Sequence, residues 1–230
     1  MGGIGRLDYG RGMAAKQRPE RDLNQLGPVP DREQARRPGR PRPSGPRAWR
    51  ADIDQVLISS RRIARRVRGL SIEITRDFAQ HDLVVVSLLN GTVLFLADLI
   101  RHLSLPLRLD FIGVSSYGTG TVSGELVFTK ELRLDVGGRE VLLVDDILDT
   151  GRTMKRVQVM LEKLGPRRIR TCVLLDKPSR RIEPVHADYV GFKIPDLFVV
   201  GYGMDYAERY RNLPFVGVLK AEMFAGPPSP

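Results

Sequence analysis

The chain has 230 residues, a net charge of +10 and a single cysteine, which allows one globular domain with a tail but excludes an internal disulfide. No apolar run reaches the ~18 residues of a membrane span, and the N-terminus lacks the apolar core of a secretory signal. We therefore expect a cytoplasmic protein without a membrane partner.

Most of the positive charge belongs to the N-terminal segment. Residues 1–50 carry 12 basic and 5 acidic side chains, so seven of the ten net charges lie there. This segment is rich in Arg, Pro and Gly and has no helical or strand period, which predicts a disordered tail. An RNA-binding arm is a weak alternative, and we otherwise expect no nucleic-acid partner. The folded domain is predicted over residues 51–222, followed by a frayed end over 223–230.

The first half of the folded region alternates a helix with strands. Ser59 or Ser60 can cap a helix whose apolar residues lie three or four positions apart: Ile63, Val67, Leu70 and Ile74. The arginines between them are expected on its solvated face. A buried strand is predicted over residues 83–89, then a Gly turn and a second helix before Pro106. "LRLDFIGVSSY" and "LVFTKELRL" predict two further strands on either side of a Gly-rich stretch.

The second half continues the same alternation. "VLLVDDILDTGRTM" predicts a strand and then a helix that stops near Gly165, with one apolar face made of Met154, Val157, Met160, Leu161 and Leu164. "IRTCVLLD", "FVVGY" and "FVGVLK" predict more strands. Apolar strands alternating with helices indicate a doubly wound α/β fold, mainly parallel, with helices on both faces. Ligands bind at the carboxyl ends of such strands, where "LLNG" and "VDDILDTGRT" lie.

The acidic turn at residues 145–153 predicts a ligand site. Unpaired buried charge is costly, so Asp145 and Asp146 are expected to hold something. The amides from Thr150 to Thr153 would point outward at the positive end of a helix and form an anion cradle, with Gly151 allowing close approach. Two carboxylates suit sugar hydroxyls or a hydrated magnesium ion. Together they predict a site for a ribose 5-phosphate; a capped, solvated loop is the weaker interpretation.

Other motifs are absent or fail in context. "GTGTVSG" is followed by a predicted strand, so it is no dinucleotide fingerprint, and the chain has neither a P-loop nor a G-x-S-x-G motif. The three histidines lack metal-ligand spacing. Cys172 lies inside an apolar strand and is predicted to be a core residue.

"VLLVDDILDTGRTM" closely resembles the phosphoribosyl-pyrophosphate signature of the type I phosphoribosyltransferases. "SLLNGTVLFLADLIRHL", "SSYG", "LLDKPSRR" and "VGFKIPDLFVVGYGMDYAERYRNLPFVGVL" resemble, in order and spacing, the hypoxanthine-guanine branch over about residues 53–220. The resemblance implies the type I fold with a small hood formed by terminal segments. It also implies purine salvage, with Mg²⁺: transfer of the phosphoribosyl group to hypoxanthine or guanine, giving IMP or GMP and pyrophosphate.

The resemblance also implies roles for individual residues. The phosphoribosyl group is expected on Asp145, Asp146, Asp149, Thr150, Gly151, Arg152 and Thr153, with Asp149 as the catalytic base or acid at the imidazole nitrogen. The purine is expected on Ile147, Lys177, Phe198, Val199 and Asp205, with Lys177 donating to the 6-oxo group. Pyrophosphate is expected on Leu89, Asn90, Gly91 and Arg211. Magnesium is expected on Asp145, Asp146 and Asp205, and a mobile loop is expected at Ser116 and Tyr117.

Two further points concern the resemblance. Many relatives have Lys or Arg where this chain has Asn90, which leaves the pyrophosphate contact at this position open. Relatives are commonly homodimers or homotetramers, so we expect one of these states. Three alternatives use the same signature: an RNA-binding regulator of the uracil-phosphoribosyltransferase type, a catalytically silent phosphoribosyl-pyrophosphate sensor, and a xanthine-preferring enzyme.

Overall fold

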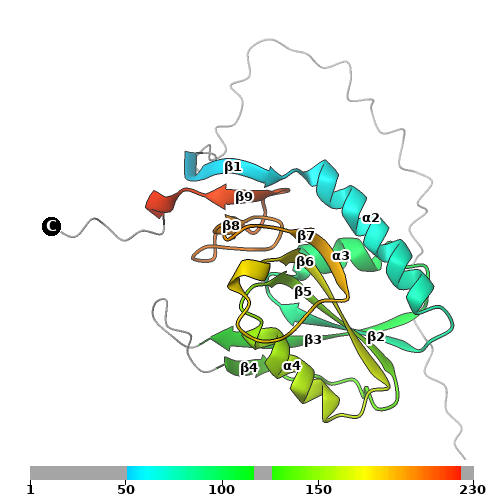
Figure 1. The fold of residues 1–230 in the computed structure, drawn as a ribbon. Helices are drawn as coiled ribbons and strands as arrows, with labels where there is room; N and C mark the ends of the chain where they lie inside the picture. The colour runs from blue at the N-terminus through cyan, green and yellow to red at the C-terminus, as the bar shows by residue number, and fades with distance from the viewer. Residues whose placement is uncertain (1–50, 117–125, 224–230) are drawn as a thin grey trace, which may run out of the picture. The chain divides into compact units, whose positions relative to one another are not determined.

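The computed structural model describes residues 51–116 and 126–223, which belong to the second of the two units of the chain, Pro46–Pro230. The expected tail over residues 1–50 therefore lies outside the described residues. Two sheets are present, one of six strands and one of three (Figure 1). The larger sheet has the strand order β4-β3-β2-β5-β6-β7, so β2 and β5 are its central strands.

The larger sheet is parallel except at one edge. Every neighbouring pair in it is parallel apart from β3 and β4, which are antiparallel. The parallel strands contain long apolar runs because both of their faces are covered. Its strands are β2 (Leu83–Leu89), β3 (Leu107–Ser116), β4 (Leu126–Lys130), β5 (Glu140–Leu148), β6 (Arg168–Asp176) and β7 (Tyr189–Lys193).

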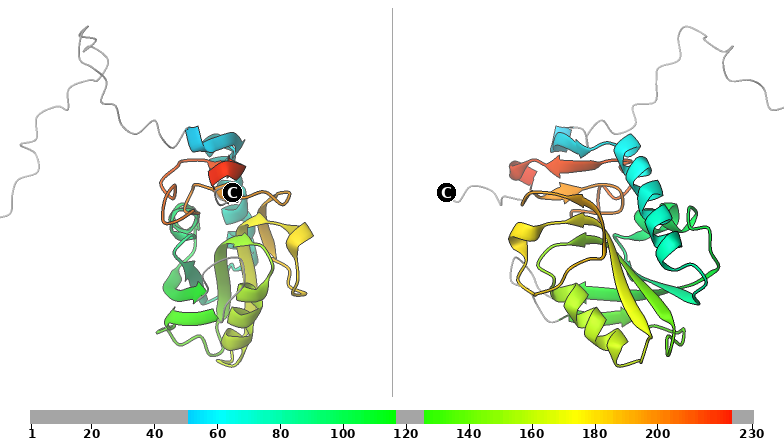
Figure 2. Two further views of the ribbon diagram at one scale, coloured as in Figure 1. Left: turned by 90° about the vertical axis from the view of Figure 1, so that its left-hand side faces the viewer. Right: turned by 45° about the vertical axis from the view of Figure 1, so that its right-hand side comes forward.

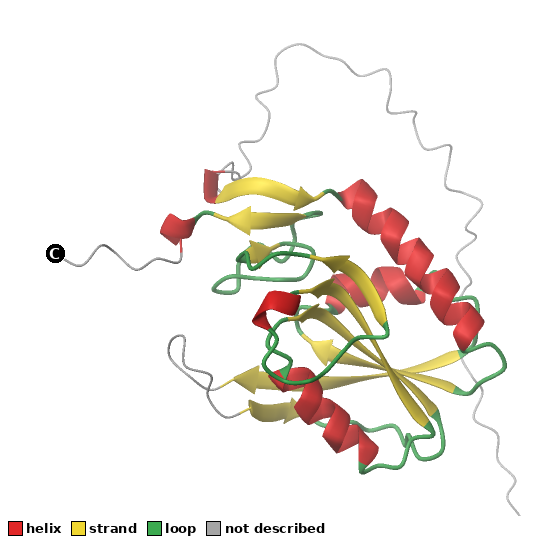
Figure 3. Ribbon diagram, viewed as in Figure 1, coloured by secondary structure: helices red, strands yellow, loops and turns green. Residues whose placement is uncertain are grey.

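Helices cover both faces of this sheet (Figure 3). Helices α2 (Ser60–Asp77) and α3 (Val93–Ile100) pack on one face, and α4 (Arg152–Glu162) packs on the other. Alternate residues of β5 serve the two faces: Leu142 and Val144 face α2 and α3, whereas Val141 and Leu143 face α4. This period of two is the pleat of a strand buried on both sides. The doubly wound fold expected from the sequence is confirmed.

A smaller antiparallel sheet forms the hood. It joins β1 (Ile53–Ile58), β9 (Val216–Leu219) and β8 (Val199–Val200), so it combines both ends of the described chain. Figure 2 shows β1 and β9 side by side, with α2 leading from β1 toward the larger sheet. The hood of terminal segments is therefore confirmed. Short 3-10 turns follow β6 and β9, at Pro178–Arg180 (η2) and Ala221–Met223 (η3).

Several details differ from the expectations. The predicted strand 126–134 stops at Lys130, and Leu164 lies beyond the end of α4 with 48% of its surface exposed. Ser59 is the N-cap of α2 but makes no side-chain cap hydrogen bond. Arg66 is not on a solvated face: its guanidinium donates to the carbonyls of Val190 and Gly191 in β7. Within the described residues, no helix has both the length and the apolarity needed to cross a membrane.

The early end of β4 is caused by one buried carboxylate, Asp110. Its Oδ1 accepts from Lys130 Nζ at 2.8 Å and from the amide of Phe111 at 2.7 Å, and its Oδ2 accepts from the amides of Arg133 and Leu134 at 2.6 and 2.9 Å. Burial raises the pKa of Asp110, but these hydrogen bonds outweigh burial and hold the pKa well below its usual range. The chain after Lys130 therefore turns toward Asp110 instead of extending the strand.

We predict that Asp110→Asn destabilises the fold by about 1–3 kcal/mol at pH 7, because a buried hydrogen-bond network loses its charge. The lowered folded-state pKa means that the stabilisation is present above the unfolded value of ~3.9 and is lost as the pH falls below it. Urea unfolding at pH 7 and pH 3 should therefore give a smaller difference between wild type and variant at pH 3. Equal stability of the two proteins at pH 7 would contradict the assignment.

Candidate active site

Two cavities meet at the carboxyl end of β5. One has a volume of about 1280 Å³ and lies under the hood, and the other, of about 280 Å³, lies at the start of α4. Asp146, Ile147 and Asp149 line both of them. This is the sheet edge at which a doubly wound fold binds its ligands.

The smaller cavity lies at the turn where the sequence predicts an anion cradle. It is lined by Thr150, Gly151 and Thr153 together with the ends of β2 and β5. Gly151 is the N-cap of α4 with φ of 87°, and a Cβ there would lie 2.6 Å from Val185 Cγ2, so only glycine fits without strain. The first amides of a helix have no partner within the helix and attract anions. The fold therefore gathers Thr150, Gly151 and Thr153 around one cavity, and anion binding there stays a prediction.

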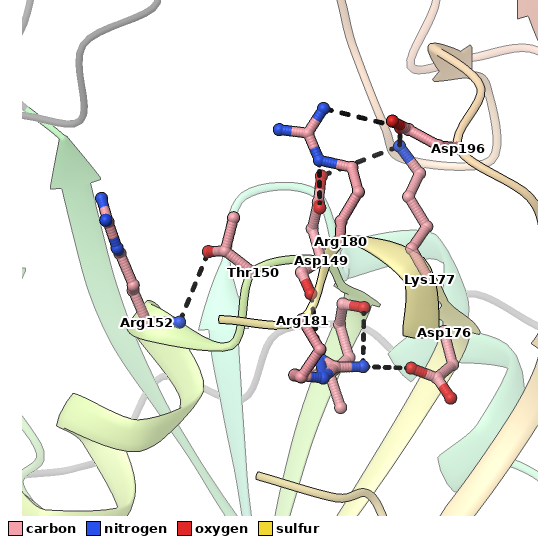
Figure 4. Close-up of polar contacts among 9 residues, drawn as sticks. Asp149, Thr150, Arg152, Asp176, Lys177, Arg180, Arg181 and Asp196 are labelled. Atoms are coloured by element: carbon pink, nitrogen blue, oxygen red, sulfur yellow. Dashed lines mark hydrogen bonds and ion pairs between the residues drawn. The ribbon is translucent and has the colours of Figure 1, made fainter. Parts of the chain in front are cut away.

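The turn that forms the cradle is held from outside by the segment after η2. Arg181 donates to the carbonyl of Asp149 at 2.9 Å and to that of Leu148 at 3.3 Å (Figure 4). The amides of Ile182 and Glu183 both donate to the carbonyl of Thr150, at 2.9 and 3.0 Å. These contacts fix the turn before any ligand arrives, which lowers the entropy cost of binding.

Asp145 and Asp146 form a half-buried carboxylate pair. Asp145 Oδ1 accepts from the amide of Asp146 at 2.9 Å and from the hydroxyl of Thr92 at 3.4 Å. Burial raises the pKa of Asp145 well above its usual value, and the neighbouring charge of Asp146 raises it further. Burial also raises the pKa of Asp146. The pair is therefore strained electrostatically whenever both groups are ionised.

The loop after β2 packs against this pair. A Cβ on Gly91 would lie 1.8 Å from Asp146 Oδ2, and a Cβ on Gly203 would lie 1.9 Å from the Gly91 carbonyl oxygen. The Leu89–Asn90 peptide bond is cis. Leu89 lines the smaller cavity. The glycines at these positions let the loop, the pair and the hood approach one another closely.

The pair has the donor set that Mg²⁺ prefers. Carboxylate oxygens are hard ligands, and a bound cation would offset the repulsion between Asp145 and Asp146. In the described part of the chain, no group of three or more His, Cys, Asp or Glu side chains is arranged to hold an ion. An ion on this pair would take its remaining ligands from substrate oxygens and water, as Mg²⁺ commonly does.

The larger cavity carries the residues expected on the purine. Ile147, Lys177, Phe198, Val199 and Asp205 all line it. Lys177 is only 5% exposed, and its Nζ lies 3.7 Å from Asp149 Oδ2 (Figure 4). Phe198 is 40% exposed.

Four of the described residues expected to bind substrate line neither cavity: Asn90, Gly91, Arg152 and Arg211. Arg211 is bound to Asp205 Oδ1 at 2.9 Å, Glu208 Oε2 at 2.9 Å and the Gly203 carbonyl at 3.0 Å. Arg152 begins α4, and its amide donates to Thr150 Oγ1 at 3.5 Å. The positions expected in the mobile loop are Ser116, which ends β3, and Tyr117, which lies outside the described residues.

Sequence reasoning missed several residues of the site. Tyr206 lines the larger cavity, and its ring stands edge-to-face to Phe198, with centroids 5.5 Å apart. Arg180 and Asp196 line the same cavity. Thr92 donates to Asp145 from the N-cap position of α3. All four lie inside the stretches that carry the family resemblance, but their type and spacing gave no separate signal.

Comparison with known proteins agrees with this fold. The phosphoribosyl transferase domain model matches residues 54–207, and the chain belongs to this family. Hypoxanthine-guanine phosphoribosyltransferase of Bacillus subtilis is 45% identical over 174 residues, covering 75% of this chain and 97% of that protein. The corresponding protein of Streptococcus pyogenes is 41% identical over 175 residues, covering 76% of this chain and 97% of that one.

Solved structures agree as well. Hypoxanthine phosphoribosyltransferase of Staphylococcus aureus superposes with a TM-score of 0.74 at 41% identity, covering 77% of this chain and 97% of that one. Hypoxanthine phosphoribosyltransferase of Trypanosoma cruzi, in a ternary substrates complex, has a TM-score of 0.71 at 36% identity and covers 76% and 100% of the two chains.

The carboxylate pair predicts that removing one of its charges stabilises the fold. A carboxyl whose pKa is raised in the folded state binds its proton more tightly there than in the unfolded chain. Its contribution to the free energy of unfolding is fully present below the unfolded pKa of ~3.9 and is lost as the pH rises through the folded pKa. Asp145→Asn should therefore raise the melting temperature at pH 7, by roughly 2–4 °C for each kcal/mol of relieved repulsion. The gain should shrink as the pH approaches 4. Added Mg²⁺ should stabilise wild type more than the variant.

Thermal melts at pH 7 and pH 5, with and without Mg²⁺, check this prediction. Asp110→Asn is the matched control, because the pKa of Asp110 is shifted in the opposite direction and its loss should lower the melting temperature at pH 7. An Asp145→Asn protein that melts below wild type at pH 7 would rule out a destabilising pair.

Proposed function

We propose that this protein is a purine salvage enzyme that transfers the 5-phosphoribosyl group from phosphoribosyl pyrophosphate to hypoxanthine or guanine. The products are IMP or GMP and pyrophosphate. The observation that carries the proposal is the separation of 3.7 Å between Asp149 Oδ2 and Lys177 Nζ on the wall of the larger cavity. A 6-oxopurine has an imidazole N–H and a carbonyl oxygen on one edge. The carboxylate can accept from the first, and the ammonium can donate to the second.

The same edge discriminates among bases. Adenine has an amino group in place of the 6-oxo group. Its N–H donors would face the N–H donors of the Lys177 ammonium, so no hydrogen bond could form. Uracil has no imidazole ring to reach Asp149. Phe198 supports the ring by stacking, and Tyr206 holds Phe198 edge-on. The RNA-binding regulator and the xanthine-preferring enzyme are not favoured, since the relatives at 41–45% identity are hypoxanthine-guanine phosphoribosyltransferases.

The positions of the two cavities support separate roles for them in the reaction. The cradle from Thr150 to Thr153 holds the 5-phosphate, and Asp145 and Asp146 hold the ribose between the cavities. Fixing both reactants in line removes much of the entropic barrier. As the purine nitrogen bonds to the ribose carbon, the bond to pyrophosphate breaks, and Asp149 takes the proton from the imidazole nitrogen on the edge that it contacts.

The remaining roles concern pyrophosphate and magnesium. Leu89, Asn90, Gly91 and Arg211 receive the pyrophosphate, so Arg211 would exchange part of its contact with Asp205 for the leaving group. Asp145 and Asp146 would hold Mg²⁺, and Asp205 would contribute to the binding of a second ion. Magnesium, when bound, offsets the charge of the departing pyrophosphate. Ser116 and Tyr117 belong to the loop that closes over the reactants and excludes water. We further propose a homodimer or homotetramer.

A spectrophotometric assay tests the proposal. The purified chain is supplied with Mg²⁺, phosphoribosyl pyrophosphate and one base at a time: hypoxanthine, guanine, xanthine, adenine or uracil. Nucleotide formation from hypoxanthine or guanine is the expected result. Turnover of uracil alone would move the protein to the regulatory branch. If no nucleotide formed from any of the five bases while phosphoribosyl pyrophosphate still bound, the protein would be a sensor.

Asp149→Asn should lower turnover of hypoxanthine by ~10²–10⁴, the usual contribution of a general base. The amide keeps the size of the side chain, so the melting temperature and the affinity for phosphoribosyl pyrophosphate should change little. Steady-state kinetics and a thermal melt provide the measurement. Turnover close to that of wild type would remove Asp149 from the role of base.

A further inference from the structure

Arg180 lies between two carboxylates on the wall of the larger cavity. Its Nε is 2.9 Å from Asp149 Oδ1, and its Nη1 is 3.5 Å from Asp196 Oδ1 (Figure 4). Lys177 stands on the other side, with its Nζ 3.7 Å from Asp149 Oδ2 and 4.0 Å from Asp196 Oδ1. The four side chains form a ring in which acids and bases alternate.

The ring gives the two oxygens of Asp149 different neighbours. Oδ1 is shielded from solvent and accepts no hydrogen bond from the described residues, but it forms an ion pair with Arg180, whereas Oδ2 lies toward Lys177. The terminal torsion of an aspartate is soft, so a carboxylate held at neither oxygen would turn readily. The electrostatic attraction of the Arg180 ion pair at Oδ1 opposes this rotation and favours the orientation with Oδ2 beside the Lys177 ammonium.

Arg180 is itself anchored to the end of β5, next to Asp149. The amide of Lys177 donates to the Leu148 carbonyl at 3.0 Å, and the amide of Arg180 donates to the Lys177 carbonyl at 3.2 Å. Arg181 binds the carbonyls of Leu148 and Asp149. The turn η2 is therefore fixed to the end of β5, and Arg180 extends from it to Asp149. Asp196 braces the outer side of the guanidinium from the loop that leads to β8.

We propose that Arg180 is a positioning residue, which fixes the Asp149 carboxylate so that Oδ2 meets the imidazole N–H of the purine while Lys177 meets the 6-oxo oxygen. The inference rests on the proposed function. Arg180 stays on Oδ1 throughout, and Asp196 keeps the guanidinium from swinging into the cavity. An arginine suits this role because its planar fork can contact two carboxylates at once, whereas lysine offers a single point charge.

A positioning role differs measurably from two other roles. If Arg180 bound a phosphate of the substrate, its loss would raise the KM for phosphoribosyl pyrophosphate. If the ring were only a surface ion-pair network, its loss would leave kcat unchanged. If Arg180 acts through Asp149, its loss lowers kcat only while Asp149 is present, because residues that act as a unit are not additive.

The experiment measures kcat, the KM of each substrate and the melting temperature for Arg180→Gln, Arg180→Lys and Asp196→Asn. Arg180→Gln should lower kcat with hypoxanthine by ~10–100-fold, the loss expected from a misplaced catalytic group. The KM for phosphoribosyl pyrophosphate and the melting temperature should stay close to wild type. Arg180→Lys should restore part of kcat, and Asp196→Asn should lose less than Arg180→Gln. Arg76→Gln is the control, since Arg76 is 77% exposed and pairs only with the neighbouring Asp77 among the described residues.

The decisive comparison repeats Arg180→Gln in the Asp149→Asn background. No further loss of kcat there is the result expected from a positioning residue. An equal fold-loss in both backgrounds, a raised KM for phosphoribosyl pyrophosphate, or an unchanged kcat in the wild-type background would each overturn the proposal. A wild-type chain that turns over none of the bases would instead overturn the proposed function, and the role of Arg180 with it.

Discussion

The carboxylates of Asp145 and Asp146 lie side by side at the carboxyl end of a central strand, and no described Lys or Arg forms a salt bridge with either. Burial and mutual repulsion raise the pKa of Asp145, so the pair gains most from hydroxyl donors or a cation. The neighbouring elements are shaped around it: Thr92 donates to it, and Gly91 lies against Asp146 without room for a side chain. A fold optimised only for stability would not place these acids here.

The two cavities are lined by different kinds of charged and polar groups. The smaller one is lined by the turn that opens α4, where helix amides and hydroxyls suit an anion, and it lies next to the carboxylate pair. On one wall of the larger cavity the charges are paired, because Arg180 and Lys177 face Asp149 and Asp196. A neutral base therefore binds against a wall of paired charges. Hydrogen bonds are strong there, and the polar groups are already oriented before the base binds. The doubly wound sheet joins the two environments because β5 ends where they meet.

Patterns within single segments predicted most of the fold. The buried runs of β2, β5 and β6 and the apolar faces of α2 and α4 stand out because each is set by local periodicity. Two strands gave no such signal. β1 has exposed residues in its middle, and β7 is interrupted by Gly191, where a Cβ would lie 2.3 Å from the Leu174 carbonyl oxygen. Tertiary contact, rather than propensity, makes these segments strands.

The sequence by itself determined that a strand ends in Asp145 and Asp146, that a Gly-opened helix follows, and that both stand at the ligand-binding edge of a parallel sheet. These features depend on residues that are close in the chain. Only the tertiary structure decided that Thr92 donates to Asp145, 53 positions away, and that Arg180 and Asp196 complete a ring around Asp149. The sequence does not distinguish a charged side chain that is solvated from one that is paired with another charge. Its partner is chosen by how separate strands and turns pack together.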